Sequence, residues 1–190
     1  MGISILLLAG LGFAIWAYIP LCRDVYNRTL TQSLATYGLW GLLDAINAGS
    51  TYSKGGNYWL PLLYAAMSFA VVAIIFLRNF NRKWELIETI CTIFVLASIV
   101  VWYFVSDELA IVVSTIGVVV AGLPQLKDVW KDPAGAPLGP YVLFVIANGL
   151  STMAGKDWSI QERLYGSACT VLTITFAMVA AMRWLPKKKS

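Results

Sequence analysis

Apolar stretches long enough to cross a membrane recur along this chain and limit what it can fold into. A helix needs roughly 20 mostly apolar residues to span the hydrocarbon core of a bilayer, with about 17 as the lower end. Only 13% of the residues are charged and 59% are apolar, too few charges to cover a surface in water. The sequence therefore predicts an all-α membrane protein whose partner is the lipid bilayer. The seven expected transmembrane helices lie near 2–22, 33–52, 58–78, 85–105, 108–126, 138–154 and 161–184.

The basic residues divide unevenly between the two sides that seven alternating spans create. One side holds Lys54, Lys156 and Arg163, and all the other Lys and Arg residues fall on the opposite side. Because such residues collect on the cytoplasmic side, we expect the N-terminus outside and the C-terminus in the cytoplasm. The same bias explains the net charge of +4, so no nucleic-acid partner is expected. The cytoplasmic set is Arg23, Arg28, Arg78, Arg82, Lys83, Lys127, Lys131, Arg183, Lys187, Lys188 and Lys189.

An internal repeat organises the chain. Residues 18–47 align without a gap onto residues 122–151, at an offset of 104. A second match, at an offset of 101, sets Leu63-Tyr64-Ala65 against Leu164-Tyr165-Gly166. The first alignment pairs Arg23-Asp24-Val25-Tyr26 with Lys127-Asp128-Val129-Trp130, Tyr37 with Tyr141, Trp40 with Phe144, Asp44 with Asn148, and Asn47 with Ser151.

The repeat predicts two bundles of three helices joined by one linker helix. The expected boundaries are 1–79 for the first triple-helix bundle, 80–107 for the linker and 108–190 for the second bundle. A single linker helix gives both bundles the same orientation in the membrane. Parallel repeats of this kind occur in transporters, which bind solute where the repeats meet.

The end of the fifth apolar stretch carries Leu123-Pro124-Gln125, followed by a basic and acidic loop, and Pro20 stands at the matching position of the first copy. With the arrangement of three, one and three helices, these residues make nearly the whole chain similar to the PQ-loop superfamily. That superfamily includes the SWEET and SemiSWEET sugar transporters, cystinosin, lysosomal cationic amino-acid exporters and the KDEL receptor. The resemblance implies a multi-pass transporter, of the bacterial seven-helix type, in the plasma membrane.

The chain departs from this family pattern at two positions. The first copy has Leu21 where the second has glutamine, and Thr36 stands where SWEET transporters carry one of four prolines. Proline removes a backbone N–H and allows a helix to bend. The residues expected to act as hinges are Pro20, Pro124, Gln125 and Pro140.

Asp44 stands near the middle of an expected span. It lies 11 residues after Ser33, or about 16 Å at roughly 1.5 Å per residue, in a hydrocarbon layer about 30 Å thick. A carboxylate at this depth costs about 2.5–3.5 kcal/mol on insertion scales, so it is expected to face a polar cavity. No basic residue lies at comparable depth, which leaves water, a proton, Asn148 or a cationic ligand as its partner. We hypothesise that Asp44 couples transport to protons or selects a cationic solute.

Polar and aromatic side chains recur near Asp44 and Asn148 at helical spacing, which places them on one face of each helix. Rings can cover the apolar faces of a small polar solute, and amides can bond its hydroxyls or amines. We predict a central cavity for a sugar, an amino acid or an amine. Any one of its polar residues could instead hydrogen-bond a neighbouring helix. The predicted solute-binding residues are Trp40, Asp44, Asn47, Tyr64, Phe144, Asn148, Ser151 and Tyr165.

Other functions fit the sequence less well. An enzyme is not expected, since no nucleophile–base pair or phosphate loop is visible. No metal or cofactor is expected either, because the chain has no histidine and its three cysteines show no metal spacing. A receptor of the KDEL-receptor type remains the alternative, although it would need basic residues where this chain has Asp44. Glu88, at the end of a span, is expected to be solvated. The oligomeric state stays open.

Overall fold

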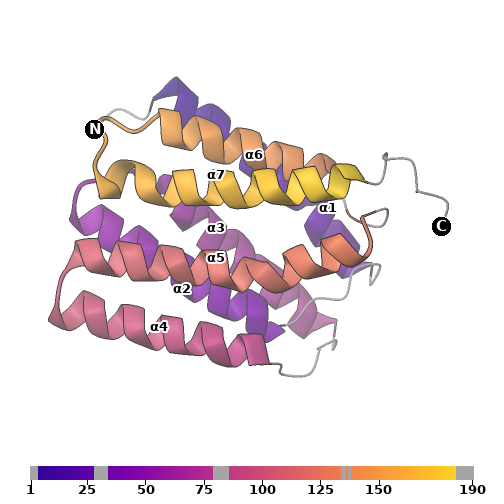
Figure 1. The fold of residues 1–190 in the computed structure, drawn as a ribbon, viewed down its shortest axis with the longest axis horizontal. Coiled ribbons are helices and arrows are strands. Elements are labelled where there is room, and N and C mark those ends of the chain that lie inside the picture. The colour runs from indigo at the N-terminus through magenta and orange to yellow at the C-terminus, as the bar shows by residue number, and fades with distance from the viewer. Residues whose placement is uncertain (1–3, 28–33, 79–85, 134–135, 137, 183–190) are drawn as a thin grey trace.

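The computed structural model describes residues 4–27, 34–78, 86–133, 136 and 138–182, which form seven α-helices (Figure 1). Each helix coincides with one predicted apolar stretch, so the all-α prediction is confirmed over these ranges. The expected boundary at 79 and 80 and the basic residues Arg28, Arg82, Lys83, Arg183 and Lys187–Lys189 lie outside them. The helices are α1 (Ile5–Tyr26), α2 (Leu34–Ser53), α3 (Trp59–Leu77), α4 (Leu86–Phe104), α5 (Asp107–Lys131), α6 (Leu138–Met153) and α7 (Ile160–Ala181).

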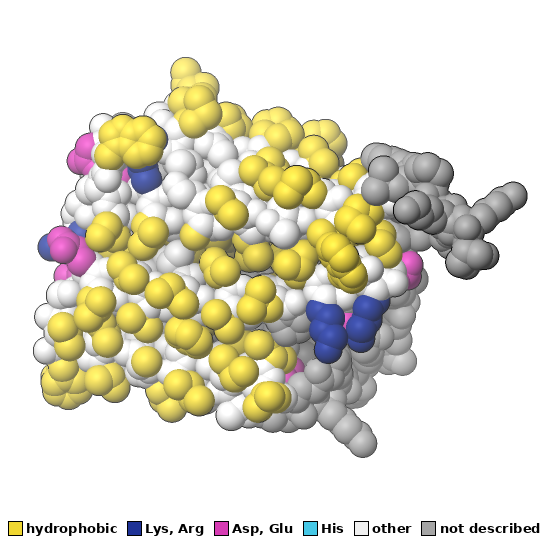
Figure 2. All heavy atoms as spheres, viewed as in Figure 1, with side chains coloured by type: hydrophobic (Ala, Val, Ile, Leu, Met, Phe, Trp, Pro, Cys, Tyr) yellow, Lys and Arg dark blue, Asp and Glu magenta, His cyan; other side chains and the backbone are white. Residues whose placement is uncertain are grey.

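Five of these helices are long and apolar enough to cross a membrane, namely α1, α3, α4, α5 and α7. Helix α6 has only 16 residues, and α2 has 20 residues but carries more polar side chains. Large apolar side chains are exposed along the long helices, for example Ile93 on α4 and Val171 on α7. Figure 2 shows such side chains spread across the face of the molecule, with charged side chains at its two ends. This surface suits an integral membrane protein.

Six helices form a closed ring. Helix α3 packs between α1 and α2, and α7 packs between α5 and α6. The ring closes where α1 packs on α6 and where α2 packs on α5. These contacts follow the repeat: α1 with α3 corresponds to α5 with α7, α2 with α3 corresponds to α6 with α7, and α1 with α6 corresponds to α5 with α2. Helix α4 packs against α2 and α5 from outside the ring, and it lies at the lower edge in Figure 1.

Short polar segments begin and end the helices. The Ser4 and Ser106 side chains each accept a hydrogen bond, 3.2 Å long, from a backbone N–H in the first turn of α1 and α5. Such caps satisfy N–H groups that have no partner within the helix. Gly55, with φ +67°, lies in the tight turn after α2, where a residue without Cβ adopts this conformation at least cost. The turn lets α3 run back along α2.

The molecule has two distinct ends. The Lys54 end carries the connections 54–58 and 154–159, together with the start of α5. The Lys127 end carries the last turns of α1, α5 and α7 and the first turns of α2 and α6. Helix α1 begins at the left-hand end of Figure 1 and α7 ends at the right-hand end.

Glu88 corrects one expectation from the sequence. Its side chain is buried, and it accepts a hydrogen bond of 2.9 Å from the hydroxyl of Thr36. The prediction that it is solvated is wrong because α4 packs against α2 at this level. Thr36 thus links α2 to α4.

The contact between α1 and α6 is close at Gly10, which gives a first prediction. A Cβ added there would lie 3.0 Å from the carbonyl oxygen of Ala147, a backbone atom that cannot move aside easily. We expect Gly10→Val to destabilise the protein by about 1–3 kcal/mol through overpacking. The measurement is thermal unfolding in detergent, followed by circular dichroism.

Gly12→Val is the matched control, since a Cβ at Gly12 meets no atom within 4 Å. Both substitutions change helix propensity in the same way, so their difference reports packing. Equal unfolding temperatures for the two variants would contradict the close contact between α1 and α6.

Candidate functional site

A cavity of about 110 Å³ lies inside the ring of six helices. This space exceeds the roughly 10–15 Å³ that one water needs, so it can hold a small organic solute. Every helix of the ring contributes to its lining, and α4 contributes none of the lining residues. The lining residues are Tyr18, Leu21, Tyr37, Trp40, Asp44, Tyr64, Ser68, Val118, Gln125, Tyr141, Phe144, Asn148, Tyr165, Cys169, Leu172, Thr173 and Phe176.

Two hydrogen bonds cross the cavity between the two halves of the chain. The hydroxyl of Tyr165 on α7 donates to Oδ1 of Asp44 on α2 at 2.6 Å. The hydroxyl of Tyr64 on α3 donates to Oδ1 of Asn148 on α6 at 3.0 Å. Asp44 and Asn148 are each eleventh in their helices, and Tyr64 and Tyr165 are each sixth. The two bonds are therefore equivalent contacts that the repeat relates to each other.

The repeat extends to most of the lining. Six pairs of lining residues stand at the sequence offsets that align the two copies, although the sequence analysis included only some of them in the site. Helical spacing could have indicated Tyr37 and Tyr141, which stand seven residues before Asp44 and Asn148 and so share their helix faces. The pairs are Leu21 with Gln125, Tyr37 with Tyr141, Trp40 with Phe144 and Asp44 with Asn148 at 104, and Tyr64 with Tyr165 and Ser68 with Cys169 at 101.

Asp44 lacks a cationic partner among the described residues. Its side chain is 4% exposed, and Tyr165 is its hydrogen-bond donor. No Lys or Arg lines the cavity. Removing a carboxylate from water without a countercharge is costly, so the group is stable there when it is protonated, hydrated or paired with a bound cation. Asp44 is thus the chemically distinctive residue of the site.

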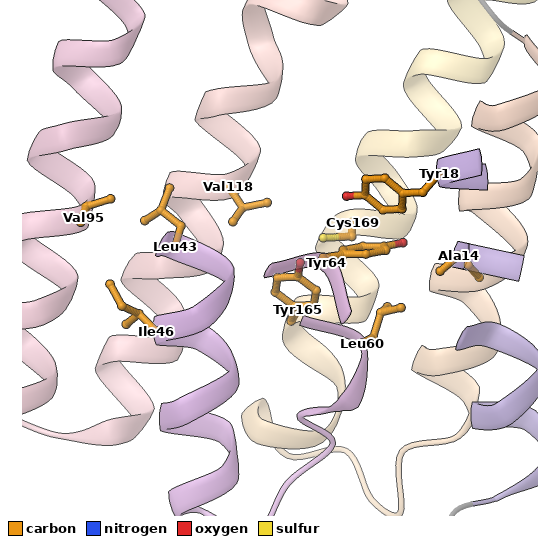
Figure 3. Close-up of a cluster of buried hydrophobic side chains, with 11 residues drawn as sticks. Ala14, Tyr18, Leu43, Ile46, Leu60, Tyr64, Val95, Val118, Tyr165 and Cys169 are labelled. Atoms are coloured by element: carbon orange, nitrogen blue, oxygen red, sulfur yellow. The ribbon is translucent and has the colours of Figure 1, made fainter. Parts of the chain in front are cut away.

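Aromatic rings form the wall beside this carboxylate. The ring centroids of Tyr18 and Phe144 lie 5.2 Å apart, those of Tyr64 and Phe144 lie 5.9 Å apart, and those of Tyr64 and Tyr165 lie 6.3 Å apart. Figure 3 shows Tyr18, Tyr64, Tyr165 and Cys169 gathered on one side of the helix that carries Leu43. Edge-to-face pairs of this kind stabilise each other and hold the rings in place.

Of the eight residues predicted to bind solute, the structure brings six to the cavity: Trp40, Asp44, Tyr64, Phe144, Asn148 and Tyr165. Asn47 and Ser151 do not line it, and the prediction that they do is wrong.

The reason is that these two residues lie where their helices pack against other helices, α2 against α5 and α6 against α1. The Asn47 amide donates to Ser114 Oγ and Thr115 Oγ1 of α5, at 3.0 and 2.8 Å. Ser151 lies against α1, where its backbone nitrogen is 3.4 Å from the Cβ position of Gly10. Both residues therefore take the alternative role of joining helices.

The predicted hinge residues occupy different settings. Pro20 lies within α1, so the carbonyl of Trp16 has no proline N–H to accept. Gln125 lines the cavity and donates to the Tyr141 hydroxyl at 3.2 Å. Pro124 falls within the bounds of α5. Pro140 lies in the first turn of α6, where backbone N–H groups have no partner inside the helix, so it leaves no carbonyl of α6 unpaired.

Contacts between the halves close the Lys54 end. The Asn57 amide donates to the carbonyl and the hydroxyl of Ser151, at 3.1 and 3.3 Å. The Asn57 backbone N–H donates to the carbonyl of Gln161 at 3.1 Å, and Nζ of Lys156 donates to the carbonyl of Gly55 at 3.3 Å. We call these contacts the Asn57 seal. The cavity begins at the level of Asp44, on the inner side of this seal, and extends toward the Lys127 end.

Comparison with known proteins adds no assignment: no family profile, curated protein or solved structure matches the chain. Among the residues that the structure describes, no three His, Cys, Asp or Glu side chains are grouped as metal ligands are.

The crossed hydrogen bonds give a second prediction. Tyr165→Phe removes the donor to Asp44 and is expected to destabilise the protein by about 1–3 kcal/mol, because a buried polar group loses its partner. Combining it with Asp44→Ala, which removes the acceptor, should give a non-additive effect, measured as the coupling energy of a double-mutant cycle in unfolding experiments.

Tyr103→Phe is the control, since Tyr103 is 81% exposed. Additive effects of Tyr165→Phe and Asp44→Ala would show that the two side chains do not interact in the protein.

Proposed function

We propose that the protein is a secondary transporter of a small polar solute, which works by alternating access between two repeats of three helices. The repeats are α1–α3 and α5–α7, within 1–79 and 108–190, and α4 within 80–107 links them. The observation that carries the proposal is the pair of equivalent hydrogen bonds, Tyr165 to Asp44 and Tyr64 to Asn148, that meet in one cavity. On this proposal the chain is a PQ-loop protein.

All seven helices cross the membrane in this proposal, including α2 and α6. Their polar side chains do not oppose this, because Asp44, Asn47, Asn148 and Ser151 are buried against other helices and away from the lipid-facing surface. By the distribution of basic residues, the Lys54 end faces outside and the Lys127 end faces the cytoplasm. The membrane we propose is the bacterial plasma membrane.

The described conformation then corresponds to the state closed to the outside. The Asn57 seal joins the connections after α2 and α6, and the cavity extends from Asp44 toward the cytoplasmic side. Outward opening requires the hydrogen bonds of the Asn57 seal to break. The two repeats must also move relative to each other where α1 packs on α6 and where α2 packs on α5. Pro20, inside α1, is a position where such a helix can bend.

Asp44 supplies the coupling step. A carboxylate in a closed cavity is favoured in its neutral, protonated form, and its charged form is favoured when water or a cation is present. Asn148, its counterpart in the repeat, cannot titrate. A receptor of the KDEL-receptor type is less well supported, since it would hold an acidic ligand and no Lys or Arg lines this cavity.

The seal gives a third prediction, made in a background without the native cysteines Cys22, Cys91 and Cys169. Asn57 N and Gln161 O are 3.1 Å apart, so the two positions are neighbours in the seal and a cysteine at each is designed to cross-link them. We expect oxidation of the Asn57→Cys/Gln161→Cys variant to stop transport in proteoliposomes and a reductant to restore it.

The solute for this assay is the one that most raises the unfolding temperature in a screen of sugars, amino acids and amines. Each single cysteine variant serves as the control and should transport equally with oxidant or reductant. Full transport by the cross-linked protein would refute alternating access at this seal.

A fourth prediction concerns Asp44→Asn. This variant makes position 44 identical to its counterpart Asn148 and keeps an acceptor for Tyr165, so the fold should persist. We expect it to lose accumulation driven by a pH gradient while downhill exchange of solute continues. The measurement is flux in proteoliposomes with and without the gradient, and unchanged accumulation would rule out proton coupling through Asp44.

A further inference from the structure

The polar groups of the cavity are largely occupied by one another. Asn148 accepts from Tyr64 and donates to Thr173 Oγ1 at 3.4 Å. The Trp40 indole N–H donates to the carbonyl of Val118 at 3.2 Å, and Gln125 bonds Tyr141. A sugar needs many free donors and acceptors for its hydroxyls, because unpaired polar groups are costly when they are buried. The cavity therefore fits a sugar poorly.

Asp44 provides the one charge in the lining. Its Oδ1 receives the Tyr165 hydroxyl, and its other carboxylate oxygen has no donor among the described residues. Helix α5 contributes Val118 and Gln125, neither of which titrates. The remaining titratable groups that face the cavity belong to types that are predominantly neutral near pH 7 in water. They are Tyr18 from α1, Tyr37 from α2, Tyr64 from α3, Tyr141 from α6, and Tyr165 and Cys169 from α7.

The same lining excludes ligands that carry an acidic group. A carboxylate or phosphate in this space would meet Asp44 with no Lys or Arg to balance it. Amino acids, whose carboxylates need a partner, are therefore disfavoured. A positively charged ligand meets the opposite situation, since its charge compensates that of Asp44.

Aromatic rings suit the apolar part of such a cation. Tyr18, Tyr64, Phe144 and Tyr165 form a contiguous group beside Asp44, with neighbouring centroids 5.2 to 6.3 Å apart. Ring faces attract organic ammonium ions, and several rings around one ion recognise alkylated ammonium groups. Charge compensation and ring contacts thus favour one ligand class.

We propose that the cavity binds a small organic ammonium ion without an acidic group, held by the Asp44 carboxylate and the surrounding rings. Transport of this cation rests on the proposed function, whereas binding of the cation in the cavity does not. One carboxylate holds either a proton or the ammonium ion at a time. Each ammonium ion released on one side is then replaced by a proton, which makes the cycle an exchange of one for the other.

Three probes of similar size and different charge test the proposal on the purified full-length protein in detergent. Choline is a cation, 3,3-dimethylbutan-1-ol is its uncharged counterpart, and glycine betaine adds a carboxylate to the same ammonium group. We expect choline to bind at least about ten-fold more tightly than either of the others, by isothermal titration calorimetry. Choline binding should also weaken as the pH falls, because protonation removes the charge of Asp44.

Asp44→Asn should weaken choline binding by at least about ten-fold. Glu108→Gln is the matched control: it also replaces a carboxylate by an amide, at an exposed ion pair with Lys54, and it should leave binding unchanged. If Asp44→Asn fails to fold, the comparison of the three probes and the pH series in the unaltered protein still decide the question.

Equal binding of choline and its neutral counterpart, tighter binding of betaine, no choline binding, or binding that does not change with pH would each overturn the proposal. The outcome is separable from the proposed function. Choline that binds through Asp44 without crossing proteoliposomes contradicts transport of this cation and keeps the site, whereas flux of a neutral solute with no cation preference keeps transport and removes the ammonium site.

Discussion

The burial of one carboxylate halfway along α2 is the constraint on which the arrangement of the ring depends. Such a group cannot face lipid without a large cost, so α2 must turn Asp44 toward the interior, where Tyr165 of α7 donates to it. The equivalent bond from Tyr64 to Asn148 sets the orientation of α6 against α3. Because each bond joins one half of the chain to the other, the two halves meet around a shared polar centre.

The repeat makes this centre nearly symmetric in its backbone and hydrogen bonds, and the pair Asp44 and Asn148 breaks the symmetry in charge. An amide at 148 accepts the same hydrogen bond that a carboxylate accepts at 44, so the geometry does not require the charge. On the proposed function, the charge at 44 serves as the binding position for a proton or a cation. The aromatic residues around it, such as Tyr18 and Phe144, favour organic cations over strongly hydrated ions.

The two ends of the ring are built differently, which gives the cavity a direction. Toward the Lys54 end α1 and α6 approach closely at Gly10, Asn47 bonds α2 to α5, and Asn57 bonds Ser151 of α6. Toward the Lys127 end the cavity lining includes larger aromatic side chains, among them Tyr37, Tyr141 and Phe176. Small residues and short polar contacts thus close one end, while buried aromatic side chains pack between the helices at the other.

The sequence by itself determined the seven helices, the internal repeat and the mid-helix position of Asp44, because apolar length, sequence offset and residue charge can be read directly from the chain. It also identified Trp40, Tyr64, Phe144, Asn148 and Tyr165 as cavity residues. The sequence did not separate these from Asn47 and Ser151, which share the helix face of Asp44 and Asn148. Only the packing of α5 and α1 over those positions decided that they join helices. The burial of Glu88 and the partnering of Asp44 with Tyr165 likewise depended on tertiary structure, since helical periodicity fixes which face a residue occupies but not which helix covers that face.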